Sequence, residues 1–245
     1  MTIICIITML LLLLFFKDRH RIQTVKDRRK LNPQQSAIAD FALSKTVFGM
    51  TTYDACILGC MLLNISTKGS IASFETLGIS YAATHFQLDS SVAGTIVAAC
   101  GTIGVISLLC MGKLATLISD IQLICGGMII MCIGIISLTS LEQGADNSIW
   151  RYVFAFFMMY SIGYPIGHTA VIGLFSKIIG RRPQGLLLGW FASAGSLARM
   201  FFPIVSGYLS NYSDVSVMFW LLTFILVLST VFVLASRDTL HKLSS

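Results

Sequence analysis

Apolar runs of about 20 residues, the length of a membrane-spanning helix, recur along most of the chain and are separated by short polar stretches. Because an α-helix rises about 1.5 Å per residue, such a run crosses the roughly 30 Å hydrocarbon core of a bilayer. The connections are short, which makes consecutive helices antiparallel neighbours. The pattern therefore predicts an all-α, polytopic membrane helix bundle. Full spans are predicted at residues 50–80, 91–112, 119–140, 150–175, 184–209 and 215–236.

A further, incomplete span precedes them at residues 1–16, which as a helix would be about 24 Å long, less than the hydrocarbon core. The run lacks the basic residue before it and the small-residue cleavage site after it that a signal peptide has. We interpret it as the second half of a transmembrane helix, which brings the bundle to about seven spans. A basic cytosolic loop between two bundles is predicted at 17–47, a six-helix bundle at 48–236 and a cytosolic tail at 237–245.

Composition agrees with a membrane protein. Hydrophobic residues make up 56% of the chain and charged residues only 11%, whereas soluble domains carry about 25% charged residues. The net charge of +6 does not indicate a nucleic-acid partner, because the basic residues flank apolar runs and form no patch interleaved with aromatic residues. Membrane lipid is the expected surrounding of most of this chain.

The distribution of Lys and Arg among the loops predicts the orientation. With residues 17–47 in the cytosol, fourteen loop Lys and Arg residues lie inside and only Arg151 lies outside, as the positive-inside rule requires. This topology places the amino end and the Asn-Tyr-Ser sequon of Asn211 on the outer or lumenal side, where Asn211 is open to glycosylation. A second sequon, at Asn64, falls at membrane depth and is expected to stay unmodified.

The sequence lacks the motifs of soluble enzymes and of metal sites. It contains no GxSxG, HExxH, P-loop or Rossmann glycine pattern, no CxxC pair and no His/Cys cluster with zinc spacing. All seven cysteines fall inside apolar stretches, and we interpret them as small buried hydrophobic residues. We therefore expect no enzyme activity, no bound metal and no cofactor.

Three polar residues share one face of the first full span. Asn64, Lys68 and Glu75 are four and seven residues apart, so at 100° per residue they fall on one stripe. An ionisable side chain at the bilayer centre costs on the order of 3 kcal/mol and usually marks a functional site. The stripe is expected to line a wet pathway in which Glu75 carries a proton or contacts substrate. The alternative is that Lys68 and Glu75 only neutralise each other.

A second set lies on the fourth full span. Tyr160, Tyr164 and His168 follow one another at four-residue steps, and Gly163 and Pro165 can kink the helix. Their polar tips could contact a substrate, and an imidazole titrates near neutral pH in water. Aromatic core packing for the tyrosines and a plain structural hydrogen bond for His168 are the alternatives.

The fifth full span combines small residues with an arginine. Gly185, Gly189 and Gly195 predict a face where another helix backbone approaches closely. Arg199 keeps its charge, so inside a bundle it needs a carboxylate, carbonyl groups, water or an anionic substrate. Both a role in anion contact or gating and a structural ion pair are open for Arg199.

Residues 173–209 resemble the tenth and eleventh helices of transporters of the major facilitator superfamily. Within it they resemble the lysosomal branch of major facilitator domain-containing protein eight, the ceroid-lipofuscinosis neuronal seven type, which has a pattern close to LxSKIxGxxPQGxxxGWxxxxGSxARxxxP. The motif GYPIGH at 163–168 is similar to the tenth helix of this branch, and Glu75 fits the place of an acidic residue in its seventh. The pattern is matched by Ser176, Lys177, Gly180, Pro183, Gln184, Gly185, Gly189, Trp190, Gly195, Ser196, Ala198, Arg199 and Pro203.

The resemblance implies that the spans correspond to helices six to twelve of a twelve-helix secondary transporter, with 17–47 as the link between its halves. It further implies a small solute or ion as substrate, an amino-terminal helical bundle as partner, and a lysosomal or other endomembrane location. The chain departs from the superfamily at 111–120, where only Gly112 and Asp120 of a glycine–acidic–basic signature remain. Its loop at 141–149 is also shorter than in the animal lysosomal proteins.

Two other functions stay open at this stage. Lys68 and Arg199 could form the positively charged constriction of an anion channel of the chloride type. The chain could also be a non-transporting or degenerate membrane protein. Saturable flux driven by a proton gradient would favour the transporter, and flux that follows voltage without saturating would favour the channel.

Overall fold

The computed structural model describes residues 46–47, 50–139, 149–179 and 184–244. Several predicted features lie outside these residues: the partial span at 1–16, nearly all of the basic loop at 17–47, and the connections at 141–148 and 181–183.

Helices follow one another along the described part of the chain with short connections. Their bounds are α4 Thr52–His85, α5 Ser90–Leu117, α6 Asp120–Thr139, α7 Ile149–Phe156, η2 Phe157–Gly163, α8 Tyr164–Ile179, α9 Gln184–Ser210, α10 Val215–Ala235 and α11 Arg237–Ser244. Segments α7, η2 and α8 run on without a break as one span, Ile149–Ile179. Among the described residues, 6 helices are long and apolar enough to cross a membrane, which confirms the predicted all-α bundle.

The end predicted at residue 112 for the second full span is wrong. Helix α5 continues to Leu117, because the residues after Gly112 are compatible with a helix and contain no proline. The chain turns instead at Ile118, whose backbone is extended and whose N–H donates to the Leu114 carbonyl at 3.0 Å. Ser119 and Gln122 then form a capping box at the start of α6: the Ser119 N–H donates to Gln122 Oε1 at 3.3 Å, and the Gln122 N–H donates to Ser119 Oγ at 3.5 Å.

Two small elements were not predicted. Residues Thr46–Val47 (β1) and Met50–Thr51 (β2) pair as antiparallel strands just before α4. In the predicted tail, Arg237–Ser244 forms α11, which packs on α8 through a region that includes the buried Leu240. The first full span, predicted at 50–80, is α4, one unbroken helix of 34 residues that ends at His85.

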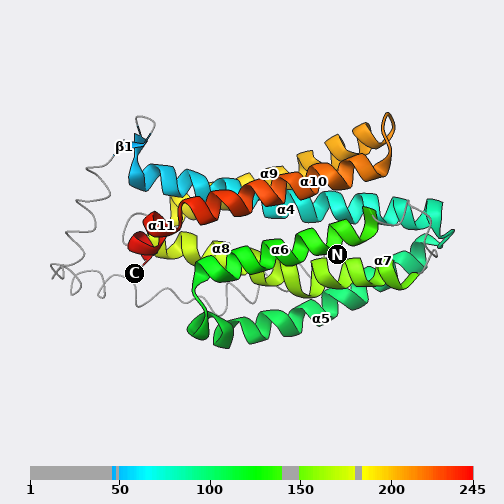
Figure 1. The fold of residues 1–245 in the computed structure, drawn as a ribbon, viewed down its shortest axis with the longest axis horizontal. Coiled ribbons are helices and arrows are strands. Elements are labelled where there is room, and N and C mark those ends of the chain that lie inside the picture. The colour runs from blue at the N-terminus through cyan, green and yellow to red at the C-terminus, as the bar shows by residue number, and fades with distance from the viewer. Residues whose placement is uncertain (1–45, 48–49, 140–148, 180–183, 245) are drawn as a thin grey trace, which may run out of the picture. The chain divides into compact units, whose positions relative to one another are not determined.

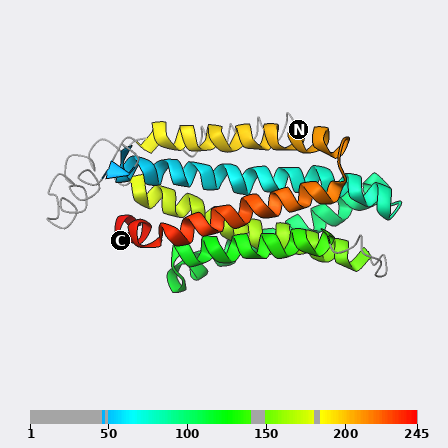
Figure 2. The same ribbon diagram turned by 45° about the horizontal axis from the view of Figure 1, so that its top comes forward.

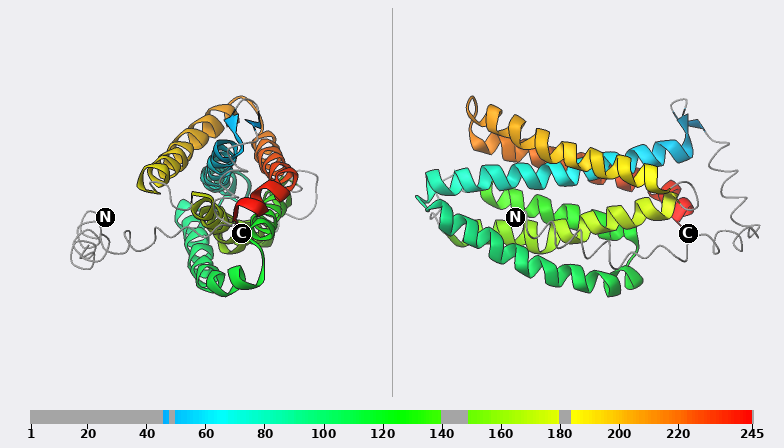
Figure 3. Two further views of the ribbon diagram at one scale, coloured as in Figure 1. Left: turned by 90° about the vertical axis from the view of Figure 1, so that its left-hand side faces the viewer. Right: turned by 180° about the vertical axis from the view of Figure 1, so that it is seen from behind.

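The helices α9, α4, α8 and α5 form a row in that order. Helix α4 packs between α9 and α8, and α8 packs between α4 and α5. Helices α6 and α10 lie behind this row, α6 against α8 and η2, and α10 against α4 and α6. Figures 1 and 2 show that the axes of the long helices are roughly aligned with one another. The end-on view in Figure 3 shows α9 and α5 at the two ends of the row.

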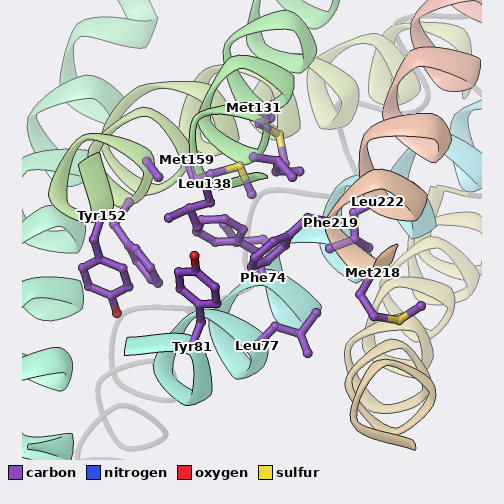
Figure 4. Packing of buried hydrophobic residues seen from close by; sticks show 14 of the residues in the cluster. Phe74, Leu77, Tyr81, Met131, Leu138, Tyr152, Met159, Met218, Phe219 and Leu222 are labelled. Carbon is purple, nitrogen blue, oxygen red and sulfur yellow. The ribbon is translucent and has the colours of Figure 1, made fainter. Parts of the chain in front are cut away.

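An aromatic core fills the space between α4, α6, α7 and α10 (Figure 4). The ring of Phe74 lies 4.8 Å from that of Phe156 and 5.9 Å from that of Phe219, and Tyr152 lies 4.6 Å from Phe156. Each such pair contributes about 0.5–1.5 kcal/mol beyond the burial of its area. This core holds α4 against the back of the bundle.

Burial differs sharply between the helices. The most apolar 18-residue window is 61% buried in α4 and in α6, but only 17% buried in α5 and in α9. Cys110, which was expected to be buried, is exposed on α5 for this reason. The two ends of the row therefore present apolar side chains that no described helix covers.

Candidate functional site

Asn64 joins α4 to α9 from a fully buried position. Its Nδ2 donates to the backbone carbonyl of Phe191 at 2.6 Å, whereas its Oδ1 has no hydrogen-bond partner among the described residues. The bond to a carbonyl requires the nitrogen on that side, so the orientation of the amide is fixed. The structure therefore leaves a buried acceptor open beside the contact between α4 and α9.

Lys68 lies over Gly195 of α9, next to Asn64. A Cβ at Gly195 would stand 2.6 Å from Lys68 Cδ and 2.8 Å from both Lys68 Nζ and Asn64 Nδ2. The ammonium and the amide are thus neighbours above a residue without a side chain. Gly195 permits a close approach that any larger residue would prevent.

His168 of α8 contacts α4 through a residue that sequence analysis missed. Thr67 Oγ1 lies 3.3 Å from His168 Nδ1, and both side chains are buried. The imidazole stacks on the ring of Tyr164, with centroids 5.1 Å apart and planes inclined by 6°. Thr67 shares the helix face of Asn64 at three residues' distance, and this spacing could have indicated it.

Glu75 and Tyr160 come together further along α4. The Glu75 carboxylate and the Tyr160 hydroxyl are close enough to interact electrostatically. The hydroxyl is buried and forms no hydrogen bond of normal length within the described part of the chain. Its ring stacks on Phe156 at 5.7 Å with an interplanar angle of 11°, so the hydroxyl is held near the carboxylate by the packing of the ring.

Arg199 is exposed on the same side of the bundle. It interacts electrostatically with Lys68 and with His168, Tyr160 and Tyr164. No carboxylate of the described residues lies within 4.0 Å of Arg199 or of Lys68. The two ion-pair alternatives, Lys68 with Glu75 and Arg199 with an acid, are therefore not formed in this arrangement.

The site thus gathers the seven polar residues that the sequence singled out. Asn64, Lys68 and Glu75 come from α4, Tyr160 from η2, Tyr164 and His168 from α8, and Arg199 from α9. The cluster holds two basic side chains, Lys68 and Arg199, and one carboxyl group, that of Glu75. Such a cluster can bind a charged or polar solute, and its carboxylate can exchange a proton with one.

A π-helical turn positions Tyr160. This turn, η2, ends at Gly163, two residues before Pro165. Ser161 Oγ donates to the Cys100 carbonyl at 2.8 Å, and Ser107 Oγ donates to the Ser161 carbonyl. Both bonds tie η2 to α5, so the wide turn is held by the neighbouring helix.

The glycines of α9 behave differently from one another. Gly195 packs against α4, whereas a Cβ at Gly185 or at Gly189 would meet nothing within 4 Å in the described part of the chain. The contact with α4 continues at Ser206, whose Oγ donates to Ser73 Oγ at 2.7 Å. The close approach of another helix to Gly185 and Gly189 stays a prediction.

The two ends of the bundle carry different groups. Asn211 is exposed in the turn between α9 and α10. At the opposite end, Lys177 Nζ lies 2.5 Å from Asp120 Oδ2, joining the end of α8 to the start of α6.

No group of three or more metal-ligating side chains occurs among the described residues.

Comparison with known proteins agrees with this architecture. The family model of the Major Facilitator Superfamily matches residues 59–244, which is most of the chain. Major facilitator superfamily domain-containing protein 8 of Xenopus laevis is 47% identical over 47 residues, a stretch that covers 19% of this chain and 9% of that protein. With its membrane-length helices, the chain is an integral, multi-pass membrane protein. It belongs to the major facilitator superfamily.

Proposed function

We propose that the chain forms the carboxyl-terminal bundle of a secondary transporter, which moves a small solute by alternating access between two bundles. One observation carries the proposal: Arg199 interacts with Lys68 and with Tyr160, and Tyr160 interacts with Glu75, so charged and polar groups of α4, η2 and α9 form one connected cluster. Ionisable groups at this depth belong beside a wet pathway.

An amino-terminal helical bundle is the proposed cover of this side. Each charge of the cluster would cost on the order of 3 kcal/mol if it faced lipid. Helices α5 and α9 expose apolar side chains, and a second bundle packed on them would cover these side chains and enclose the cluster in protein and water. Gly185 and Gly189 offer space for such a contact.

The location follows from the resemblance of residues 173–209 to the lysosomal branch. We expect the transporter in lysosomes or another endomembrane, with Asn211 on the lumenal side. Tagging the carboxyl tail and probing it in selectively permeabilised cells tests the orientation. A tail that is accessible only from the lumen would contradict the topology.

A flux experiment tests the transport function. The chain is expressed with and without a matching amino-terminal bundle and reconstituted in vesicles, and solute uptake is followed with and without a proton gradient. Saturable, gradient-driven uptake is expected only when both bundles are present. Full transport by 1–245 alone would contradict the need for an amino-terminal bundle.

Two substitutions, each made in the chain paired with its amino-terminal bundle, separate the roles of Glu75 and Arg199. Glu75→Gln should abolish proton-driven uptake while exchange of solute continues, because the neutral amide imitates the protonated acid. Arg199→Lys should impair turnover, because lysine lacks the five-donor guanidinium fork. Lys113→Gln, at an exposed site near the end of α5, is the matched control. Normal proton dependence in Glu75→Gln would reduce its carboxylate to a structural group.

An anion channel is the second candidate. The observation that favours it is that Lys68 and Arg199 have no carboxylate within 4.0 Å among the described residues. Anion flux that follows voltage and rises linearly with concentration would support the channel and exclude the transporter.

A further inference from the structure

We propose that Lys68 and Asn64 form a subsite for a carboxylate that carries its own hydrogen-bond donor, such as a hydroxy acid. This rests on the proposed transport function and adds the class of solute. The subsite lies where α4 crosses Gly195 of α9.

The charge of the cluster selects an anion. Lys68 and Arg199 are near enough to repel each other electrostatically, and neither has a carboxylate within 4.0 Å in the described part of the chain. Lys68 and Arg199 outnumber the single carboxyl group of the cluster, that of Glu75, so positive charge is in excess. A solute with a single negative charge balances it, whereas a cation would add to the repulsion.

Asn64 adds a requirement for a donor. Its Oδ1 is buried and unpartnered among the described residues, while its Nδ2 is already used by the Phe191 carbonyl. A buried acceptor left without a donor is costly. Lys68 Nζ and Asn64 Nδ2 both lie 2.8 Å from the position that a Cβ at Gly195 would take, so the ammonium and the amide are neighbours and one small molecule could contact both side chains. The anionic group faces Lys68, and the donor faces Asn64 Oδ1.

Four small probes separate charge from donor capacity. Lactate carries both a carboxylate and a hydroxyl, propionate only the carboxylate, propane-1,2-diol only hydroxyls, and choline a hydroxyl with a positive charge on a quaternary nitrogen that amine reagents do not acylate. Chloride is the reference anion. The full chain is reconstituted in nanodiscs of phosphatidylcholine, whose lipids carry no carboxylate, and each probe is added at equal concentration.

The readout is the acylation of Lys68 by an amine reagent, measured by mass spectrometry. Lys113, exposed on α5, is the internal control. Lactate should slow the acylation of Lys68 at about one fifth of the concentration that propionate needs, the effect of about one hydrogen bond. Chloride should protect more weakly than propionate, and the diol and choline should not protect.

A variant locates the donor contact. In Asn64→Ala the advantage of lactate over propionate should disappear while both still protect Lys68, and Asn211→Ala should behave as the unchanged chain does. If Asn64→Ala does not fold, the probe series on the unchanged chain decides alone. Nanodiscs that contain phosphatidylserine form a further arm, in which protection without added probe would assign the carboxylate to a lipid headgroup.

Several outcomes would overturn the inference. Equal protection by lactate, propionate and chloride means a plain anion site. Protection by choline means a cation site, and no protection by any probe means that ordered water alone satisfies Asn64. These results concern binding to the chain. Absence of flux with the binding pattern intact would instead refute the transport function and leave the subsite standing.

Discussion

Gly195→Ala tests the closest contact between α4 and α9. The new Cβ would lie 2.6 Å from Lys68 Cδ and 2.8 Å from Asn64 Nδ2. Lysine can swing away, but Asn64 is held by its 2.6 Å bond to the Phe191 carbonyl. The methyl group therefore has to displace α9 or break that bond.

The magnitude follows from the two costs. Overpacking a tight contact costs about 1–3 kcal/mol, and loss of the buried hydrogen bond adds about 1 kcal/mol. Replacing a helical glycine by alanine returns about 0.5–1 kcal/mol. Gly189→Ala gains the same free energy from the replacement of a helical glycine and causes no clash, because nothing lies within 4 Å of its Cβ position in the described residues. The two variants should therefore differ by about 2 kcal/mol or more.

Reversible unfolding in mixed detergent and SDS micelles, followed by circular dichroism, measures this difference. Gly189→Ala should unfold at a slightly higher SDS fraction than the unchanged chain, and Gly195→Ala at a clearly lower one. In a Lys68→Ala background, Gly195→Ala should cost less, because one of the two clashing groups is gone. Equal midpoints for the two glycine variants would refute the close packing.

Three further predictions concern other parts of the bundle. Ser161→Ala should destabilise the chain by about 1 kcal/mol in the same unfolding assay, because the bond to the α5 backbone is lost; an unchanged midpoint would contradict that role. Asn211→Gln should remove a glycan-dependent shift on a gel of the chain made with microsomes, whereas a shift that persists would place the sugar elsewhere. A double-mutant cycle of Asp120→Asn and Lys177→Gln should give a coupling free energy of only about 0–1 kcal/mol, since the lysine side chain is 52% exposed. A larger coupling free energy would contradict the exposed, solvent-screened character of this ion pair.

The long apolar runs made the helices predictable. Length and hydropathy alone decide that a segment such as α6 or α10 crosses a membrane. The residues at which the helices end were less predictable. Gly112, for example, has open space beside it, and nothing in its described surroundings forces a turn. The extension of α5 to Leu117 is decided by backbone bonds and by the capping box of Ser119, and hydropathy does not report these.

Part of the candidate site could also be predicted from the sequence. Helical spacing placed Asn64, Lys68 and Glu75 on one stripe of α4, and the structure brings Tyr160 and Arg199 to it from other helices. Partners across helices could not be read from one sequence, because they depend on the order in which helices pack. The π-helical turn was also hidden, since its residues have the composition of an ordinary apolar helix.

That turn has a consequence for how the chain tolerates changes of length. A π-helical turn accommodates one residue more than an α-helical turn, so η2 absorbs an insertion without rotating the helix that follows. Removing one residue from it, for example Met158, would convert η2 to α-helix and still leave Gly167 of α8 against Gly127 of α6, where a Cβ at Gly127 would stand 2.5 Å from Gly167 Cα. Relatives that lack the turn should therefore be one residue shorter between 157 and 163 and should present Tyr160 at a different angle to Glu75.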